Sequence, residues 1–144
     1  MIDGVTNADA IPVLSRMMQF AGGRHKLIVN NIANFDTPNF RPMDVSVDDF
    51  RAHLGEAIDE RRDRFGNRGG DLALDDTQDF EVHDDRLELK PRPKGDNLLF
   101  HDHNDRDRER IMQDLAENFM AFRTAAELMR SRFEILNTAI RERM

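Results

Sequence analysis

The sequence contains no cysteine, tryptophan or tyrosine, and no run of 18 or more apolar residues. Without cysteine, the chain has no disulfide, no thiolate zinc site and no cysteine nucleophile. Apolar runs shorter than about 18 residues do not cross a membrane as a helix. Asp3 and Asp9 stand where a signal peptide has basic residues, and no apolar segment follows, so we expect no cleaved signal peptide.

The net charge of −7 is unevenly distributed along the 144 residues. Residues 1–40 carry three positive and three negative charges, residues 111–144 five of each, and residues 41–110 13 positive and 20 negative. This pattern predicts an N-terminal helical arm (1–40), a polar acidic middle region (41–110) and a C-terminal coiled-coil helix (111–144). The absence of a uniformly basic surface argues against nucleic-acid binding.

The C-terminal part carries an apolar repeat with alternating steps of three and four residues, uninterrupted by Gly or Pro. Sustained over about four heptads, this spacing is typical of a coiled-coil helix. We call this set the C-terminal stripe: Met112, Leu115, Phe119, Phe122, Ala126, Met129, Phe133, Leu136 and Ile140.

An isolated helix with this stripe would be unstable. Burial of its apolar side chains yields ~15–25 kcal/mol, whereas ordering the backbone costs about 1–2 kcal/mol per residue. The helix therefore needs a partner, which is either another helix of the same domain or other copies of the chain. If copies are needed, both terminal arms of a dilute monomer would be poorly ordered and exchange amide protons rapidly.

The N-terminal arm shows the same spacing from Ile11, with Pro12 in the first turn, Asp9 as a possible cap and Gly22-Gly23 as weak points. Its His25 is interpreted as a polar interface residue rather than a ligand. The two arms are predicted to pair, giving a mainly α fold with a coiled coil of long terminal helices. We call the apolar set of this arm the N-terminal stripe: Ile11, Leu14, Met18, Ala21, Ile28 and Ile32.

The middle region is predicted to be small and irregular. Ser46 followed by Asp49 has the form of a helix start, and apolar spacing extends that helix to about Arg64. Alternation in 80–82 and 87–89 predicts a β-hairpin, 98–100 a further short strand, and 66–70 a flexible loop.

His101 and His103 form the cluster that invites metal chemistry, since two His two residues apart could bind Zn or Ni. A solvated polar segment before the last helix is the favoured interpretation. No cofactor loop, nucleophile–base set or pair of catalytic carboxylates can be placed, so we expect no bound metal, no cofactor and no enzymatic activity.

Residues 30–41 combine a helix end with a turn: Thr37 precedes Pro38, and Asn39 tolerates a left-handed backbone. Three Asn carboxamides can bond a neighbouring backbone here. The stretch resembles the N-terminal signature of bacterial flagellar axial proteins, with Asn39 and Phe40 where Gly and Tyr are usual. The matching residues are Asn30, Asn31, Ile32, Ala33, Asn34, Asp36, Thr37, Pro38 and Phe40.

Asp36-Thr37-Pro38 and the C-terminal helix are most similar to proximal-rod members of that family. The resemblance implies a structural subunit that builds the proximal rod of the flagellar basal body by helical polymerisation through its terminal helices. It implies contacts with other copies, other rod proteins, and the inner-membrane ring and rod-adaptor proteins. Export through the flagellar type III apparatus, without a cleaved signal, would place it in the periplasmic rod.

A second hypothesis is a soluble helical-hairpin adaptor or export chaperone that binds one partner helix. It requires the same stripes but a fixed stoichiometry. A metal-dependent enzyme using His101 and His103 is the third and least favoured hypothesis.

Overall fold

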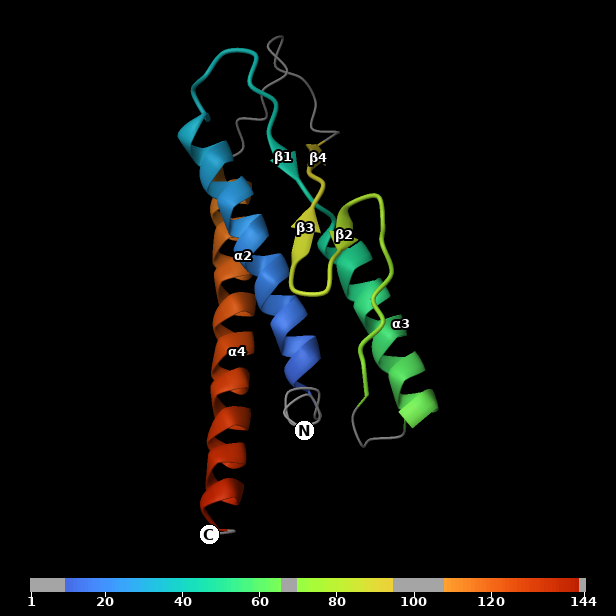
Figure 1. Cartoon of the computed structure of the whole chain (residues 1–144). Coiled ribbons are helices and arrows are strands. Elements are labelled where there is room, and N and C mark those ends of the chain that lie inside the picture. The colour runs from blue at the N-terminus through green and yellow to red at the C-terminus, as the bar shows by residue number, and fades with distance from the viewer. Residues whose placement is uncertain (1–9, 66–69, 95–107, 143–144) are drawn as a thin grey trace.

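The computed structural model describes residues 10–65, 70–94 and 108–142 of the chain. Its three described helices are α2 (Ile11–Ala33), α3 (Val47–Phe65) and α4 (Arg108–Arg141). Helix α2 lies between α4 on one side and a layer of strands and α3 on the other (Figure 1). Within the described residues, no helix is both long and apolar enough to cross a membrane.

The strands form two small antiparallel pairs. Strand β2 (Phe80–Val82) pairs with β3 (Leu87–Leu89), which confirms the predicted hairpin. Strand β1 (Met43–Asp44) pairs with β4 (Arg92–Pro93) and joins the two ends of the middle region. The predicted strand at 98–100, the Asp9 cap and most of the 66–70 loop lie outside the described residues.

Helix α3 matches the predicted middle helix within a residue at each end. The Ser46 hydroxyl accepts a hydrogen bond from the Asp49 N–H at 3.1 Å and so caps the first turn, as the sequence predicted. Apolar side chains recur on one face of the helix, where Phe50, Leu54 and Ala57 are buried.

Three phenylalanines from three elements form the centre of the core. The rings of Phe20 on α2 and Phe50 on α3 stack with centroids 3.9 Å apart, and Phe80 on β2 meets Phe50 edge-on at 5.7 Å. Val45, Leu54, Ala57 and Leu74 complete the buried cluster. The middle region is therefore a small hydrophobic unit built onto the N-terminal helix.

Helix α2 packs on both sides. Pro12 occupies its first turn, as predicted, and Ala10 precedes it without a side-chain cap. At Gly23 a Cβ atom would lie 2.6 Å from Leu89 Cδ1, so the absence of a side chain lets β3 approach the helix closely. The predicted pairing of the two long terminal helices is confirmed, because α2 and α4 run side by side (Figure 1).

Candidate assembly interface

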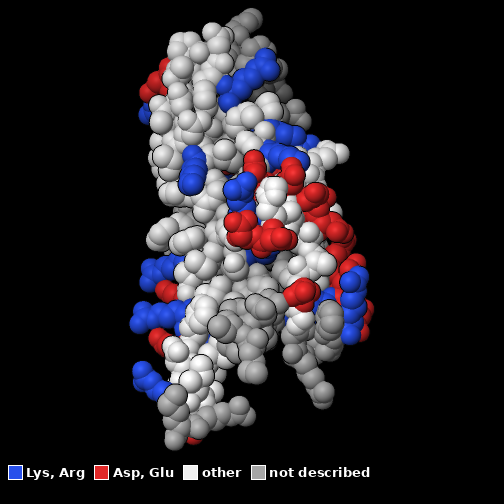
Figure 2. All heavy atoms as spheres, viewed as in Figure 1, with Lys and Arg blue, Asp and Glu red and all other residues white. Residues whose placement is uncertain are grey.

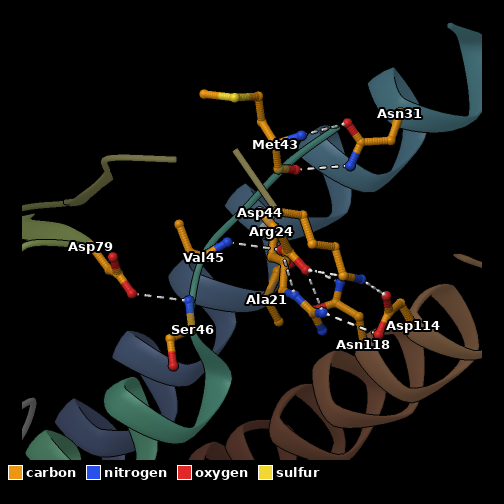
Figure 3. Close-up of polar contacts among 11 residues, drawn as sticks. Ala21, Arg24, Asn31, Met43, Asp44, Val45, Ser46, Asp79, Asp114 and Asn118 are labelled. Atoms are coloured by element: carbon orange, nitrogen blue, oxygen red, sulfur yellow. Dashed lines mark hydrogen bonds and ion pairs between the residues drawn. The ribbon is translucent and has the colours of Figure 1, made fainter. Parts of the chain in front are cut away.

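The two terminal helices run antiparallel and are joined by a buried polar contact. The Asn118 carboxamide of α4 donates a hydrogen bond to the Ala21 carbonyl of α2 at 2.8 Å, and Asn118 is buried (Figure 3). Loss of a buried, satisfied partner of this kind costs about 1–3 kcal/mol. The contact fixes the axial position of α4 along α2.

A cluster of charged side chains ties the same two helices to β1. The Arg24 guanidinium of α2 makes two hydrogen bonds to the Asp44 carboxylate, both 2.9 Å long, and a longer one to Asp114 of α4 at 3.3 Å. Lys94 lies 2.5 Å from the other Asp114 oxygen. Figure 3 shows Asp44 and Asp114 converging on Arg24 from opposite elements.

Burial and pairing act in opposite directions on Arg24. Burial disfavours the charged guanidinium and lowers its pKa, but the hydrogen bond and charge of Asp44, together with Asp114, outweigh this and raise the pKa above its usual value. The guanidinium therefore stays charged at any ordinary pH. A buried charge of this kind depends on its partners, so the cluster specifies how α2, β1 and α4 meet.

The first strand is also held by a side chain of the axial-protein motif. The Asn31 carboxamide donates to the Met43 carbonyl at 2.8 Å and accepts from the Met43 N–H at 3.0 Å. Asn31 thus holds a neighbouring segment of backbone within the chain. Further along, the buried Asp79 accepts a hydrogen bond from the Ser46 N–H (Figure 3). Asp79 also pairs with Arg92.

The turn after α2 has the backbone that the sequence predicted. Asn39 has a φ of 61°, the left-handed conformation that Asn tolerates better than most residues. Asn34 donates to the Asn30 carbonyl at 2.9 Å and closes the helix end. Arg108 of α4 lies over the Phe35 ring, 4.7 Å from its centroid.

The residues of the axial-protein motif differ in burial. Asn31 is buried; Ile32, Asn34 and Phe40 are half-buried; and Asn30, Ala33, Asp36, Thr37 and Pro38 are exposed.

The N-terminal stripe is largely covered within the chain. Ile11, Leu14, Ala21 and Ile28 are buried, and Met18 and Ile32 are half-buried. His25, which continues the same spacing, is exposed.

The C-terminal stripe divides into two halves. Members at every second position are the less exposed ones: Leu115, Met129 and Leu136 are half-buried, and Phe122 is 37% exposed. Among the alternate members, Ala126 is half-buried, and the four larger ones are between 45% and 54% exposed, namely Met112, Phe119, Phe133 and Ile140.

The side of α4 that packs on α2 is rotated by about one residue from the stripe. Its fully buried residues are Asn118 and Ala125, each one position before a stripe member. One residue corresponds to ~100° of rotation on a helix. The pairing of the helices therefore uses small and polar side chains and leaves large apolar ones open.

Sequence reasoning missed three features of this interface. Arg24 interrupts the N-terminal stripe as a buried charge, Asn118 belongs to a seven-residue repeat with Ala125, and α4 has further exposed apolar residues. The Asn118 repeat could have been found in the sequence, because Ile111, Asn118 and Ala125 recur every seven residues beside the C-terminal stripe. The further exposed residues are Met120, Leu128 and Ile135.

Metal chemistry finds no support in the described part of the chain, where no three His, Asp or Glu residues group as a metal site. His101 and His103 lie outside it.

Comparison with known proteins gives matches over nearly the whole chain. A protein of Borrelia hermsii named flagellar basal body rod protein FlgB is 29% identical over 136 residues, which cover 92% of this chain and 96% of that protein. A protein of Bacillus subtilis (strain 168) with the same name is 25% identical over 127 residues, covering 88% and 89%. No protein-family model matches.

The two relatives support a flagellar basal body rod protein of the FlgB type. The resemblance of residues 30–41 to axial proteins therefore extends through the middle region, which carries no recognisable motif of its own.

Proposed function

We propose that this chain is a structural subunit of the proximal rod of the bacterial flagellar basal body, where it polymerises helically through its terminal helices. The proposal rests on whole-length similarity to two FlgB rod proteins. Its main structural support is the exposed half of the C-terminal stripe. Four large apolar side chains in line on one helix form a patch that isolated soluble proteins avoid and that interfaces use.

The extent of α4 adds to this argument. Ala21 lies against Asn118, so an antiparallel neighbour brings Ile11 level with about residue 128. The helix continues to Arg141, beyond the first described turn of α2 (Figure 1). Neighbouring copies, other rod proteins, and ring or adaptor proteins of the basal body are the proposed partners of this end. Export by the flagellar type III apparatus would deliver the subunit to the periplasmic rod.

A change at Phe133 tests the proposal. Phe133→Asp places a carboxylate on the exposed half of the stripe, where burial against a partner would cost several kcal/mol. In the bacterium that encodes the chain, we expect cells without basal-body rods and without motility, while the protein still leaves the cytoplasm.

Ala116→Asp is the matched control, because it puts the same charge at an exposed position outside the stripe. Motile cells with normal basal bodies in the Phe133→Asp strain would refute assembly through this helix. An adaptor or chaperone, the alternative function, would instead remain in the cytoplasm and bind its partner at a fixed stoichiometry.

A further inference from the structure

Helix α4 exposes two separate apolar faces. The first, which we call the aromatic face, consists of Met112, Phe119, Phe133 and Ile140; the second, the aliphatic face, consists of Met120, Leu128 and Ile135. Phe119 and Leu128 are nine residues apart, so their side chains leave the helix axis in opposite directions, ~180° apart. The members of the aliphatic face are 50–62% exposed, as open as those of the aromatic face.

A charged strip separates these faces on the side away from α2. Arg123 pairs with Glu127 at 2.9 Å and Arg130 with Glu134 at 3.1 Å, each one turn apart. Figure 2 shows this alternation of blue and red along the lower left edge, where Figure 1 places α4. Around the helix, the order is therefore α2, aromatic face, charged strip, aliphatic face.

One neighbouring helix cannot cover both faces. A two-fold dimer buries the same patch of each copy, so it would hide one face and leave the other in water. If the aromatic face of one copy meets the aliphatic face of the next, both faces are covered in every subunit except the two at the ends. Such a head-to-tail contact joins copy to copy, and it generates a helical filament when the rotation between copies does not close a ring.

The two faces also fit each other in size. Phe119 and Phe133 are large, whereas Leu128 has Thr124 and Ser131 as small neighbours on its side of the helix. Large side chains pack into the grooves beside small ones where helices meet. The aromatic face is also continuous with the seam on α2, because the half-buried Leu115 and Met129 lie between them.

We propose that α4 contacts two neighbouring copies at once, its aromatic face packing on the aliphatic face of the next copy. This inference rests on the proposed function, since it specifies how copies join. Each subunit thus uses the aromatic face of α4 for one neighbour and the aliphatic face of the same helix for the other.

Two variants separate the faces. Phe119→Asp disables the aromatic face and Leu128→Asp the aliphatic one, and Ala116→Asp places the same charge beside the charged strip. We expect sedimentation of the full-length chain to show association beyond the dimer, unchanged in Ala116→Asp. Each face variant alone should associate at least ten-fold more weakly, and an equal mixture should stop at a dimer, since one intact face of each kind remains.

Circular dichroism of the dilute variants provides the folding control, because both side chains are about half exposed. If either variant unfolds, Phe119→Ser and Leu128→Ser replace the pair. A wild-type chain that stays monomeric overturns both this inference and polymerisation. Wild-type association with no effect of either variant, or stable dimers of one variant alone, overturns the two-face arrangement and leaves polymerisation intact.

Discussion

Helices α2 and α4 carry the same three-and-four apolar spacing, yet only α2 has its stripe covered. Four members of the N-terminal stripe are buried, whereas no large member of the C-terminal stripe is. The difference follows from position, because among the described elements α2 has neighbours on two sides and α4 on one (Figure 1). Periodicity in a sequence thus reports that a helix has an apolar side, not which molecule covers that side.

The largest expected difference between the helices is in amide exchange. In a verified monomer, the amides of Phe20 to Ile28, packed against the core and α4, should exchange on the order of a thousand-fold more slowly than those after Arg130. Hydrogen exchange with mass spectrometry measures this gradient. Equally fast exchange in both helices would instead support the sequence-based expectation that both terminal arms are poorly ordered in the monomer and fold on assembly.

Removal of Arg24 should break the link between the helices. Arg24→Ala removes the guanidinium that pairs with both half-buried carboxylates, Asp44 and Asp114, so we expect a loss of about 3 kcal/mol of unfolding free energy. Urea denaturation measures the loss. Arg130→Ala removes an exposed ion pair of α4 and should change the unfolding free energy by less than ~0.5 kcal/mol. An equally small effect at Arg24 would mean that packing alone positions α4.

Glycine replacements give the smallest effects, with opposite signs. Gly22→Ala would place its Cβ 4.0 Å from Phe122, an ordinary contact, and should raise thermal stability by about 0.5–1 kcal/mol through helix propensity. Gly23→Ala would force Leu89 to move, so we expect a net loss of about 1 kcal/mol.

Gly55→Ala on α3, where nothing lies within 4 Å of the new Cβ, is the control and should resemble Gly22→Ala. A stabilising Gly23→Ala would show that β3 can retreat from α2 without cost. Thermal unfolding of the three variants in parallel provides the measurement.

Local sequence patterns were sufficient to predict the individual helices, the hairpin and the turn. The Ser46 cap, the hairpin at 80–89 and the left-handed Asn39 depend on residues within a few positions of one another, and each was predictable. Helix α4 also formed where its spacing predicted, although it begins earlier, at Arg108.

The contacts between these elements could not be predicted from local sequence patterns. Arg24 finds Asp44 20 residues away and Asp114 90 residues away, and no local spacing encodes such partners. The rotation of α4 was missed for another reason. A shift of one residue turns a helix by ~100°, and a stripe containing Leu115, Phe122 and Met129 fits either the neighbouring α2 or a second copy.

The hydrogen bond from Asn118 to Ala21 spans 97 residues of sequence. Closing so long a loop is entropically costly and can occur only when nearly the whole chain is available, so the two ends should join late in folding. Until then, the N-terminal helix has no α4 to pack against, and the chain remains extensible. For a subunit proposed to be exported by the flagellar type III apparatus, slow closure of its ends lengthens the time during which the two terminal arms stay apart.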